Sequence, residues 1–293
     1  GSVDAIKLNA DFVAVLSEGR INLDALDEGG HYAGISRVFP ESKENRDVTC
    51  LALTKDFLVY GTTRGVLSIV CLPELETVSE FRHDAAITAV FPNLLGTRIA
   101  FVDSTSSGYL LCPVDDTVLP VPKVPPGCKG FLWDRTDWGV LLAHGLSTYS
   151  VYLYTANSIS GQSIAPIQTG LRYPSPSLSP ILLSNGVAIC QEPNGTISSV
   201  VLPTHEAIAQ VEGRGGATLE KIKICFHQSL ALGKMLRAWD LATLLKDKET
   251  YKALGEAAMK ALDMPLATRV YRELGDAGMV MALQKLDGLE DAH

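Results

Sequence analysis

The side chains that most often carry out chemistry are scattered along this chain. The six histidines are widely spaced in the sequence: His31, His83, His144, His205, His227 and His293. The sequence has no G-x-S-x-G nucleophile elbow, no G-x-x-x-x-G-K-[ST] phosphate loop, no H-E-x-x-H zinc helix and no G-x-G-x-x-G turn. We therefore predict no catalytic, cofactor-binding or metal-binding residue, and we expect that the protein is not an enzyme.

Three local features could still suggest a site. Asp115 and Asp116 are adjacent carboxylates, but neighbours on an extended strand point to opposite sides, so a solvated turn is the better interpretation. His144 follows three apolar residues, which is typical of a hydrogen-bonded histidine at the end of a strand. The glycines of residues 213–216 could offer N–H groups to an anion, but a flexible joint is the simpler interpretation.

Composition excludes several classes of function. The chain has 293 residues, of which 46% are hydrophobic, so it can bury a core. Its formal charge of −8 argues against nucleic-acid partners and against an anionic membrane surface. No apolar run is long enough for direct membrane insertion. The start at Gly1-Ser2, without an initiator methionine, indicates a piece of a longer protein.

The cysteines indicate a reducing compartment. They are far apart and form no C-x-x-C pair or close Cys/His pair that could begin a zinc site. Most lie in apolar runs, where a thiol behaves as a small hydrophobic side chain. We expect all six to be reduced: Cys50, Cys71, Cys112, Cys128, Cys190 and Cys225.

The first part of the chain shows blade-like repeats. Short β-rich runs with glycine-containing turns recur at a spacing of about 40 residues, which favours a propeller over a sandwich. Predicted strands within these units lie at residues 12–16, 20–23, 48–53, 57–61, 66–72, 86–90, 98–102, 109–114, 130–133, 139–143, 149–154, 185–190 and 196–202. Trp133-Asp134 and Trp239-Asp240 do not stand where a blade-closing signature belongs, so the repeats are degenerate.

About five units fit into this region, short of a closed seven-bladed ring. Such a gap would be bounded by unpaired strand edges, which invite pairing with another chain. We therefore expect the isolated chain to pair through an edge, either as a homodimer or between neighbouring molecules in a crystal; the alternative is a closed five-bladed ring.

The second part of the chain is helical. An apolar stripe with a helical period contains Leu219, Ile222, Phe226, Leu230, Met235, Leu236, Trp239 and Leu244. Asp263 with Pro265 predicts a helix start. A tetratricopeptide (TPR) pattern places large and small packing residues at Tyr251, Leu254, Gly255, Ala258, Ala267, Tyr271 and Leu274.

The predicted fold is mainly β with an α C-terminal part. Residues 3–210 form part of a degenerate, incomplete WD40-like β-propeller. Residues 211–217 form a linker, and residues 218–293 form the start of a TPR-like α-solenoid.

Several runs in the helical part carry a family resemblance. Thr218-Leu-Glu, Leu230-Ala-Leu-Gly-Lys234, Ala238-Trp-Asp-Leu241 and the stretch from Ala267 to Met281 resemble the WD repeat-containing protein nineteen family, subunits of intraflagellar transport complex A. The resemblance covers the segment that joins the second propeller to the helical repeats. It implies a non-catalytic scaffold for retrograde ciliary transport and for entry of membrane proteins into the cilium.

The same resemblance implies partners and a location. The partners would be other subunits of intraflagellar transport complex A and, indirectly, ciliary membrane cargo. The location would be the cytoplasmic side of the cilium or flagellum and the basal body. Two alternatives remain open at this stage: a coatomer-type vesicle coat subunit, which shares the propeller-then-solenoid layout, and a propeller enzyme with a site in its central channel.

Overall fold

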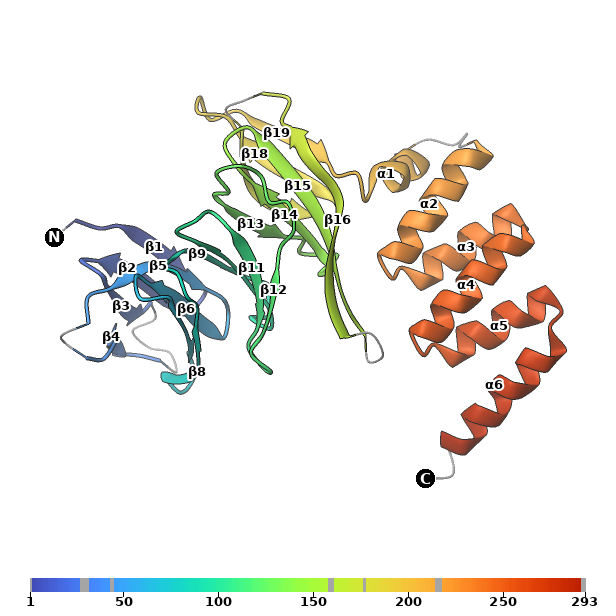
Figure 1. The fold of residues 1–293 in the computed structure, drawn as a ribbon, viewed down its shortest axis with the longest axis horizontal. Helices are drawn as coiled ribbons and strands as arrows, with labels where there is room; N and C mark the ends of the chain where they lie inside the picture. The colour runs from blue at the N-terminus through green and yellow to red at the C-terminus, as the bar shows by residue number, and fades with distance from the viewer. Residues whose placement is uncertain are drawn as a thin grey trace. The chain divides into compact units, whose positions relative to one another are not determined.

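The computed structural model describes residues 2–26, 32–42, 45–157, 161–175, 178–213 and 218–290. The chain divides into two compact units, residues 1–155 with 162–200 and residues 156–161 with 201–293. Strands build the first unit and helices build the second (Figure 1). Within the described segments, no helix has both the length and the apolar character that a membrane span requires.

Five antiparallel sheets make up the strand-rich unit, each from strands that are consecutive in sequence. The first two sheets are β1 (Ala5–Leu8), β2 (Phe12–Ser17), β3 (Arg20–Ala25) and β4 (Ser36–Phe39), then β5 (Val48–Leu53), β6 (Phe57–Thr62), β7 (Val66–Cys71) and β8 (Glu76–Arg82). The third and fourth are β9 (Ile87–Pro92), β10 (Ile99–Asp103), β11 (Gly108–Cys112) and β12 (Thr117–Pro120), then β13 (Gly130–Trp133), β14 (Val140–His144), β15 (Thr148–Asn157) and β16 (Gly161–Arg172). The fifth has three strands, β17 (Ser179–Ser184), β18 (Val187–Gln191) and β19 (Ile197–Val201).

These sheets are the blades of a propeller. The first strand of each blade packs against the first strand of the next, β1 on β5, β5 on β9, β9 on β13 and β13 on β17, so the first strands are innermost. Among the described residues, no comparable packing joins the fifth blade to the first. The predicted mainly-β fold with an α C-terminal part is confirmed, with five blades in an open series.

The burial of each strand follows from its neighbours. In β2, Phe12, Ala14 and Leu16 are buried and alternate with less buried residues, as expected for a strand with one covered face. All five residues of β10 are buried because a blade lies on either side of it. Separate apolar clusters fill the spaces between the first and second, the second and third, and the third and fourth blades.

Polar side chains also join consecutive blades. The Asn9 amide donates to the carbonyl of Thr54 at 2.7 Å, between the first and second blades. His83 Nε2 lies 3.2 Å from Asp103 Oδ2, between the second and third. Trp133 Nε1 donates to the carbonyl of Phe91 at 2.8 Å, between the third and fourth.

The junction of the fourth and fifth blades is organised by Asp134, whose side chain is buried. Its Oδ1 accepts from the backbone N–H groups of Thr136 (2.8 Å) and Asp137 (3.0 Å) in its own blade and of Asn185 (2.9 Å) in the fifth. Its Oδ2 accepts from the N–H of Gly186 at 2.6 Å. A buried carboxylate is tolerated when protein donors replace the hydrogen bonds that water would make to it. Here four backbone N–H groups do so.

The helical unit is a series of helices that pack on their sequence neighbours. In Figure 1 they are drawn from yellow to red. They are α1 (Glu206–Gly213), α2 (Leu219–Ala231), α3 (Met235–Leu245), α4 (Lys248–Lys260), α5 (Met264–Leu274) and α6 (Ala277–Glu290).

The boundary between the two parts differs from the prediction. Residues 206–213 form α1, so the predicted strand region to residue 210 and the linker 211–217 both extend into a helix, while residues 214–217 lie outside the described residues. Ala207, Ile208 and Val211 share one face of α1 and pack into the helical core, which explains why this short segment folds as a helix.

The helix ends and most of the predicted apolar helix faces agree with the sequence signals. The Asp263 carboxylate accepts from the N–H of Leu266 at 3.1 Å, and Gly275 ends α5 in the left-handed conformation at φ 73°. In contrast, Leu219, Leu236 and Leu244 are exposed, although the apolar period placed them on the buried stripe.

Replacing Asp134 tests the junction of the fourth and fifth blades. We expect Asp134→Asn to lower the free energy of unfolding by roughly 3 kcal/mol, because the amide loses the charge and presents an N–H where a second acceptor is needed. Urea unfolding followed by tryptophan fluorescence measures this change. The matched control is Asp116→Asn, at an exposed turn position; an equal effect of both variants would contradict the assigned role of Asp134.

Candidate functional site

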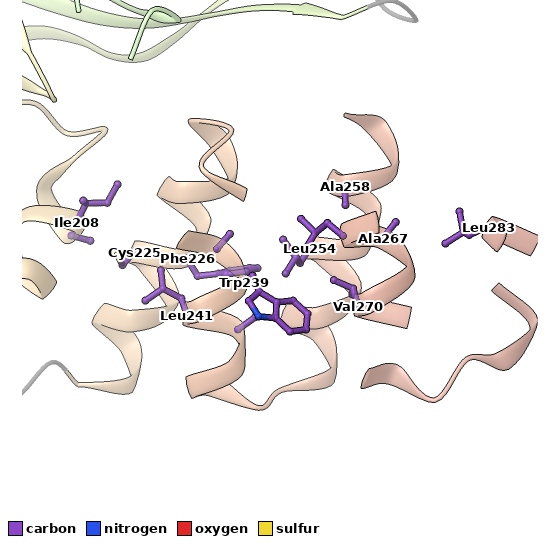
Figure 2. Close-up of a cluster of buried hydrophobic side chains, with 14 residues drawn as sticks. Ile208, Cys225, Phe226, Trp239, Leu241, Leu254, Ala258, Ala267, Val270 and Leu283 are labelled. Carbon is purple, nitrogen blue, oxygen red and sulfur yellow. The ribbon is translucent and has the colours of Figure 1, made fainter. Parts of the chain in front are cut away.

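The residues predicted to form a TPR-like repeat lie on α4 and α5. Leu254, Gly255 and Ala258 of α4 are buried, and so is Ala267 of α5. The three remaining positions, Tyr251, Tyr271 and Leu274, are half-buried and pack against the same core. Figure 2 shows Leu254, Ala258 and Ala267 within the row of buried side chains that runs through the helices.

Small residues allow α4 and α5 to approach closely. A Cβ on Gly255 would lie 3.2 Å from Val270 Cγ1 and 3.3 Å from Tyr271 Cζ, so even one methyl group there would press on α5. The Tyr271 hydroxyl lies 3.4 Å from Met259 Sδ, which joins the two helices at their partly exposed rim. The α4–α5 hairpin is therefore close-packed at Gly255.

Side-chain contacts also join helices that are not adjacent in sequence. The guanidinium of Arg269 on α5 lies 4.1 Å from the ring centroid of Trp239 on α3, a cation–π contact. Arg237 on α3 pairs with Glu212 on α1. In Figure 2, Trp239 lies between the side chains of α2 and those of α4. Each helix therefore contributes to one shared core, as in α-solenoids.

The last helix, α6, is only partly covered. Leu283 is buried in the helical core, whereas Met281 is 62% exposed and Leu286 is 51% exposed. Met279 is half-buried. The apolar stripe of α6 thus has one side packed on α5 and one side that faces outward.

The acidic pair and the histidines are spread over separate places. Asp115 and Asp116 lie in the turn between β11 and β12 and are exposed, as predicted. His144 ends β14, where burial lowers the pKa of its imidazole to about 4. His83 lies at the junction of the second and third blades, and His227 is exposed on α2. His31 and His293 lie outside the described residues.

A polar cavity of about 300 Å³ opens on one face of the second blade. Buried hydroxyl groups of Tyr60, Thr62 and Ser68 line it, and the ion pair of Asp47 with Arg64, at 2.5 Å, stands beside them. Burial raises the pKa of the Tyr60 phenol, so this group stays neutral. The cavity can accommodate polar groups.

All six cysteines are free thiols in the structure. Cys112, Cys128, Cys190 and Cys225 are buried, while Cys50 and Cys71 are half-buried. Burial raises the pKa of the Cys50, Cys128 and Cys190 thiols, which keeps them protonated and weakly reactive.

Sequence reasoning did not identify the polar groups that join the blades. His83 and Asp103 belong to no motif of the kinds sought, and Asp134 stands in a Trp-Asp dipeptide that is not a blade-closing signature. Each of the three has a partner in another blade. One signal was available, since Asp103 begins the polar turn Asp-Ser-Thr-Ser-Ser, and such residues often bind nearby backbone N–H groups. Asp103 Oδ1 indeed accepts from the N–H groups of Thr105 and Ser107.

Overpacking the α4–α5 hairpin tests the close approach of these helices. Ala267→Leu should lower the free energy of unfolding by about 1–3 kcal/mol, because the added atoms have no free volume to occupy. Thermal unfolding measured at 222 nm reports the change. Ala282→Leu makes the same replacement at an exposed position of α6, and an equal loss in both variants would contradict the packing described here.

The half-buried imidazole of His144 makes stability depend on pH. Its pKa is about 6.5 in the unfolded chain and about 4 in the fold, so the unfolded state binds more protons between these values. Stability should fall as pH drops from 6.5 to 4, with about 3 kcal/mol of the loss due to His144. In urea titrations between pH 6.5 and pH 4, His144→Gln should remove the part of the stability loss that is due to His144. A profile unaffected by His144→Gln would contradict the assignment.

Comparison with known proteins identifies relatives along the whole chain. Human WD repeat-containing protein 19 is 30% identical over 296 residues, which cover 99% of this chain and 22% of the human protein. The mouse protein of the same name is 32% identical, with the same coverage. The chain therefore spans about a fifth of the length of the curated relatives it matches.

A solved structure shares the propeller fold. Hsv2p from Kluyveromyces lactis superposes with a TM-score of 0.52 at 13% identity, over 66% of this chain and 65% of that chain. At this level of identity the similarity concerns the fold alone.

The family described as the WDR19 second beta-propeller matches residues 1–205. The match ends immediately before α1, so it contains all nineteen strands of the five blades. The chain belongs to the WDR19 second beta-propeller family.

Proposed function

We propose that this chain is a non-catalytic scaffold segment of an intraflagellar transport complex A subunit. In this proposal it mediates protein–protein interactions in retrograde ciliary transport and in the entry of membrane proteins into the cilium. The observation that carries the proposal is the family match over residues 1–205, together with 30–32% identity to mammalian WD repeat-containing protein 19 along the chain.

The architecture supports a binding role. Propeller blades and stacked helical hairpins both present large, rigid surfaces made of many short elements. The hairpin of α4 and α5, with its packing residues from Tyr251 to Leu274, is proposed to be a TPR-like repeat of an α-solenoid. Leu236 and Leu244 on α3 are 80% and 68% exposed, so this array offers apolar surface to a partner.

The proposed partners and location follow from the family. The partners are other subunits of intraflagellar transport complex A, and ciliary membrane cargo is bound through them. The proposed location is the cytoplasmic side of the cilium or flagellum and the basal body. A coatomer-type coat subunit is a less favoured alternative, because the family match is to the WDR19 propeller.

Affinity purification of the full-length parent protein from ciliated cells tests the proposal. Quantitative mass spectrometry should show enrichment of intraflagellar transport complex A subunits over coatomer subunits. Enrichment of coatomer subunits, or of neither group, would contradict the proposal.

A matched pair of variants tests whether this segment contributes. Ala267→Leu in the parent protein should reduce recovery of the complex, because it disturbs the α4–α5 hairpin, whereas Ala282→Leu should leave recovery unchanged. Parent-protein levels are compared by immunoblot, so that loss of the protein is distinguished from loss of association. Full recovery with both variants would show that this helical hairpin has no part in assembly.

A further inference from the structure

The fifth blade lacks the fourth strand that each of the other blades has. Its sheet ends at β19, whereas the other four sheets end at β4, β8, β12 and β16. In the part of the chain that the structure describes, no strand pairs with the outer edge of β19. An unpaired edge presents a row of backbone N–H and C=O groups to any strand that can approach.

The outermost strands of the four-stranded blades contain residues that discourage such pairing. Charged side chains and prolines have this effect, because they repel a second strand or remove an N–H donor. The residues of this kind are Arg37 in β4; Glu76, Glu80 and Arg82 in β8; Pro120 in β12; and Pro166 and Arg172 in β16. The sequence of β19, Ile-Ser-Ser-Val-Val, contains no charge and no proline. It is therefore the one outermost strand among the described blades without this protection.

β19 also leaves apolar side chains uncovered. Ile197 is 55% exposed and Val201 is 38% exposed. In the other blades the outermost strand brings an apolar side chain into the core between blades: Phe39, Phe81, Val118 and Ile164. The fifth blade thus lacks both the hydrogen-bonding partner and the apolar side chain that a fourth strand supplies.

The sequence of β19 is complementary to itself in an antiparallel arrangement. A two-fold axis through Ser199 sets Ile197 opposite Val201 of a second copy, and Ser198 opposite Val200. Ile197 and Val201 then form an apolar pair at each end, and no charge faces a like charge. The same patch serves both partners, as a two-fold symmetric dimer requires.

We propose that the outer edge of β19 is a strand-pairing site, and that in solution it pairs with β19 of a second copy of this chain. Two strands of five residues bury less than the roughly 1,200 Å² of a stable interface, so the dimer is weak and depends on concentration. The proposal concerns the isolated chain and does not depend on a ciliary role, so either proposal can fail without the other.

Sedimentation velocity of the purified chain over a wide concentration range tests the proposal. The wild type should show a monomer–dimer equilibrium. Ser199→Lys should raise the dissociation constant by about tenfold or more, because two lysines then face each other across the axis. The matched control, Thr169→Lys, adds the same charge at an exposed position of the outermost strand β16 and should leave the equilibrium unchanged.

A charge-reversal mixture makes the test specific for this edge. Ser199→Glu alone should weaken the dimer as Ser199→Lys does, but an equal mixture of the two variants should associate at least as well as the wild type. Circular dichroism confirms that each variant is folded. Failure of the mixture to associate, while the wild type dimerises, overturns the proposed pairing.

Hydrogen exchange of the wild type gives a readout that needs no variant. The amides of β19 should become more protected as the protein concentration rises. A monomer at every concentration overturns the proposal. Protection of β19 that does not depend on concentration also overturns it, since another segment of the same chain would then occupy the edge.

Discussion

Every blade of this protein depends on its neighbours, because a four-stranded sheet has two faces and cannot bury both of them alone. The fully buried strand β10 shows the consequence, with apolar clusters on each side of its blade. Backbone and side-chain polar groups trapped between blades must then find partners across the junction. The Asp134 carboxylate, with four N–H donors from two blades, is the clearest case. Removal of one blade would leave polar groups and apolar surface exposed together.

The helices of the second unit also depend on their neighbours, because each one buries its apolar surface mainly against the helices next to it in sequence. Each helix packs part of its apolar stripe on the helix before it and part on the helix after it. The buried core therefore continues from one helix to the next. The α4–α5 hairpin is tight because Gly255, Ala258 and Ala267 leave room for the opposing backbone. Units of this kind present extended surfaces, which agrees with the scaffold role proposed for this chain.

The sequence predicted the second and third strands of every blade, but it missed the fourth strands β4, β8, β12 and β16 and the first strands β1 and β17. Second strands such as β6 and β10 are apolar on both faces, so they stand out as continuous runs. The outermost strands β8 and β16 contain charges or proline because they face solvent, and they lack that signal. Helix α1 was missed because it is only eight residues long and ends in a glycine-rich run. The role of Asp134 in joining two blades could not be predicted, since two of its four partners are backbone N–H groups of a strand turn about 50 residues away.

The central claim is that the polar junctions make the blades one cooperative unit. Native-state hydrogen exchange measured by NMR tests it at the N–H groups of Asn185 and Gly186, which bond to Asp134. These amides should open with the same free energy and the same dependence on denaturant as the amide of Phe101 in the buried strand β10. Exchange of Asn185 and Gly186 that is orders of magnitude faster, with little dependence on denaturant, would show that the fifth blade opens alone and would contradict this account.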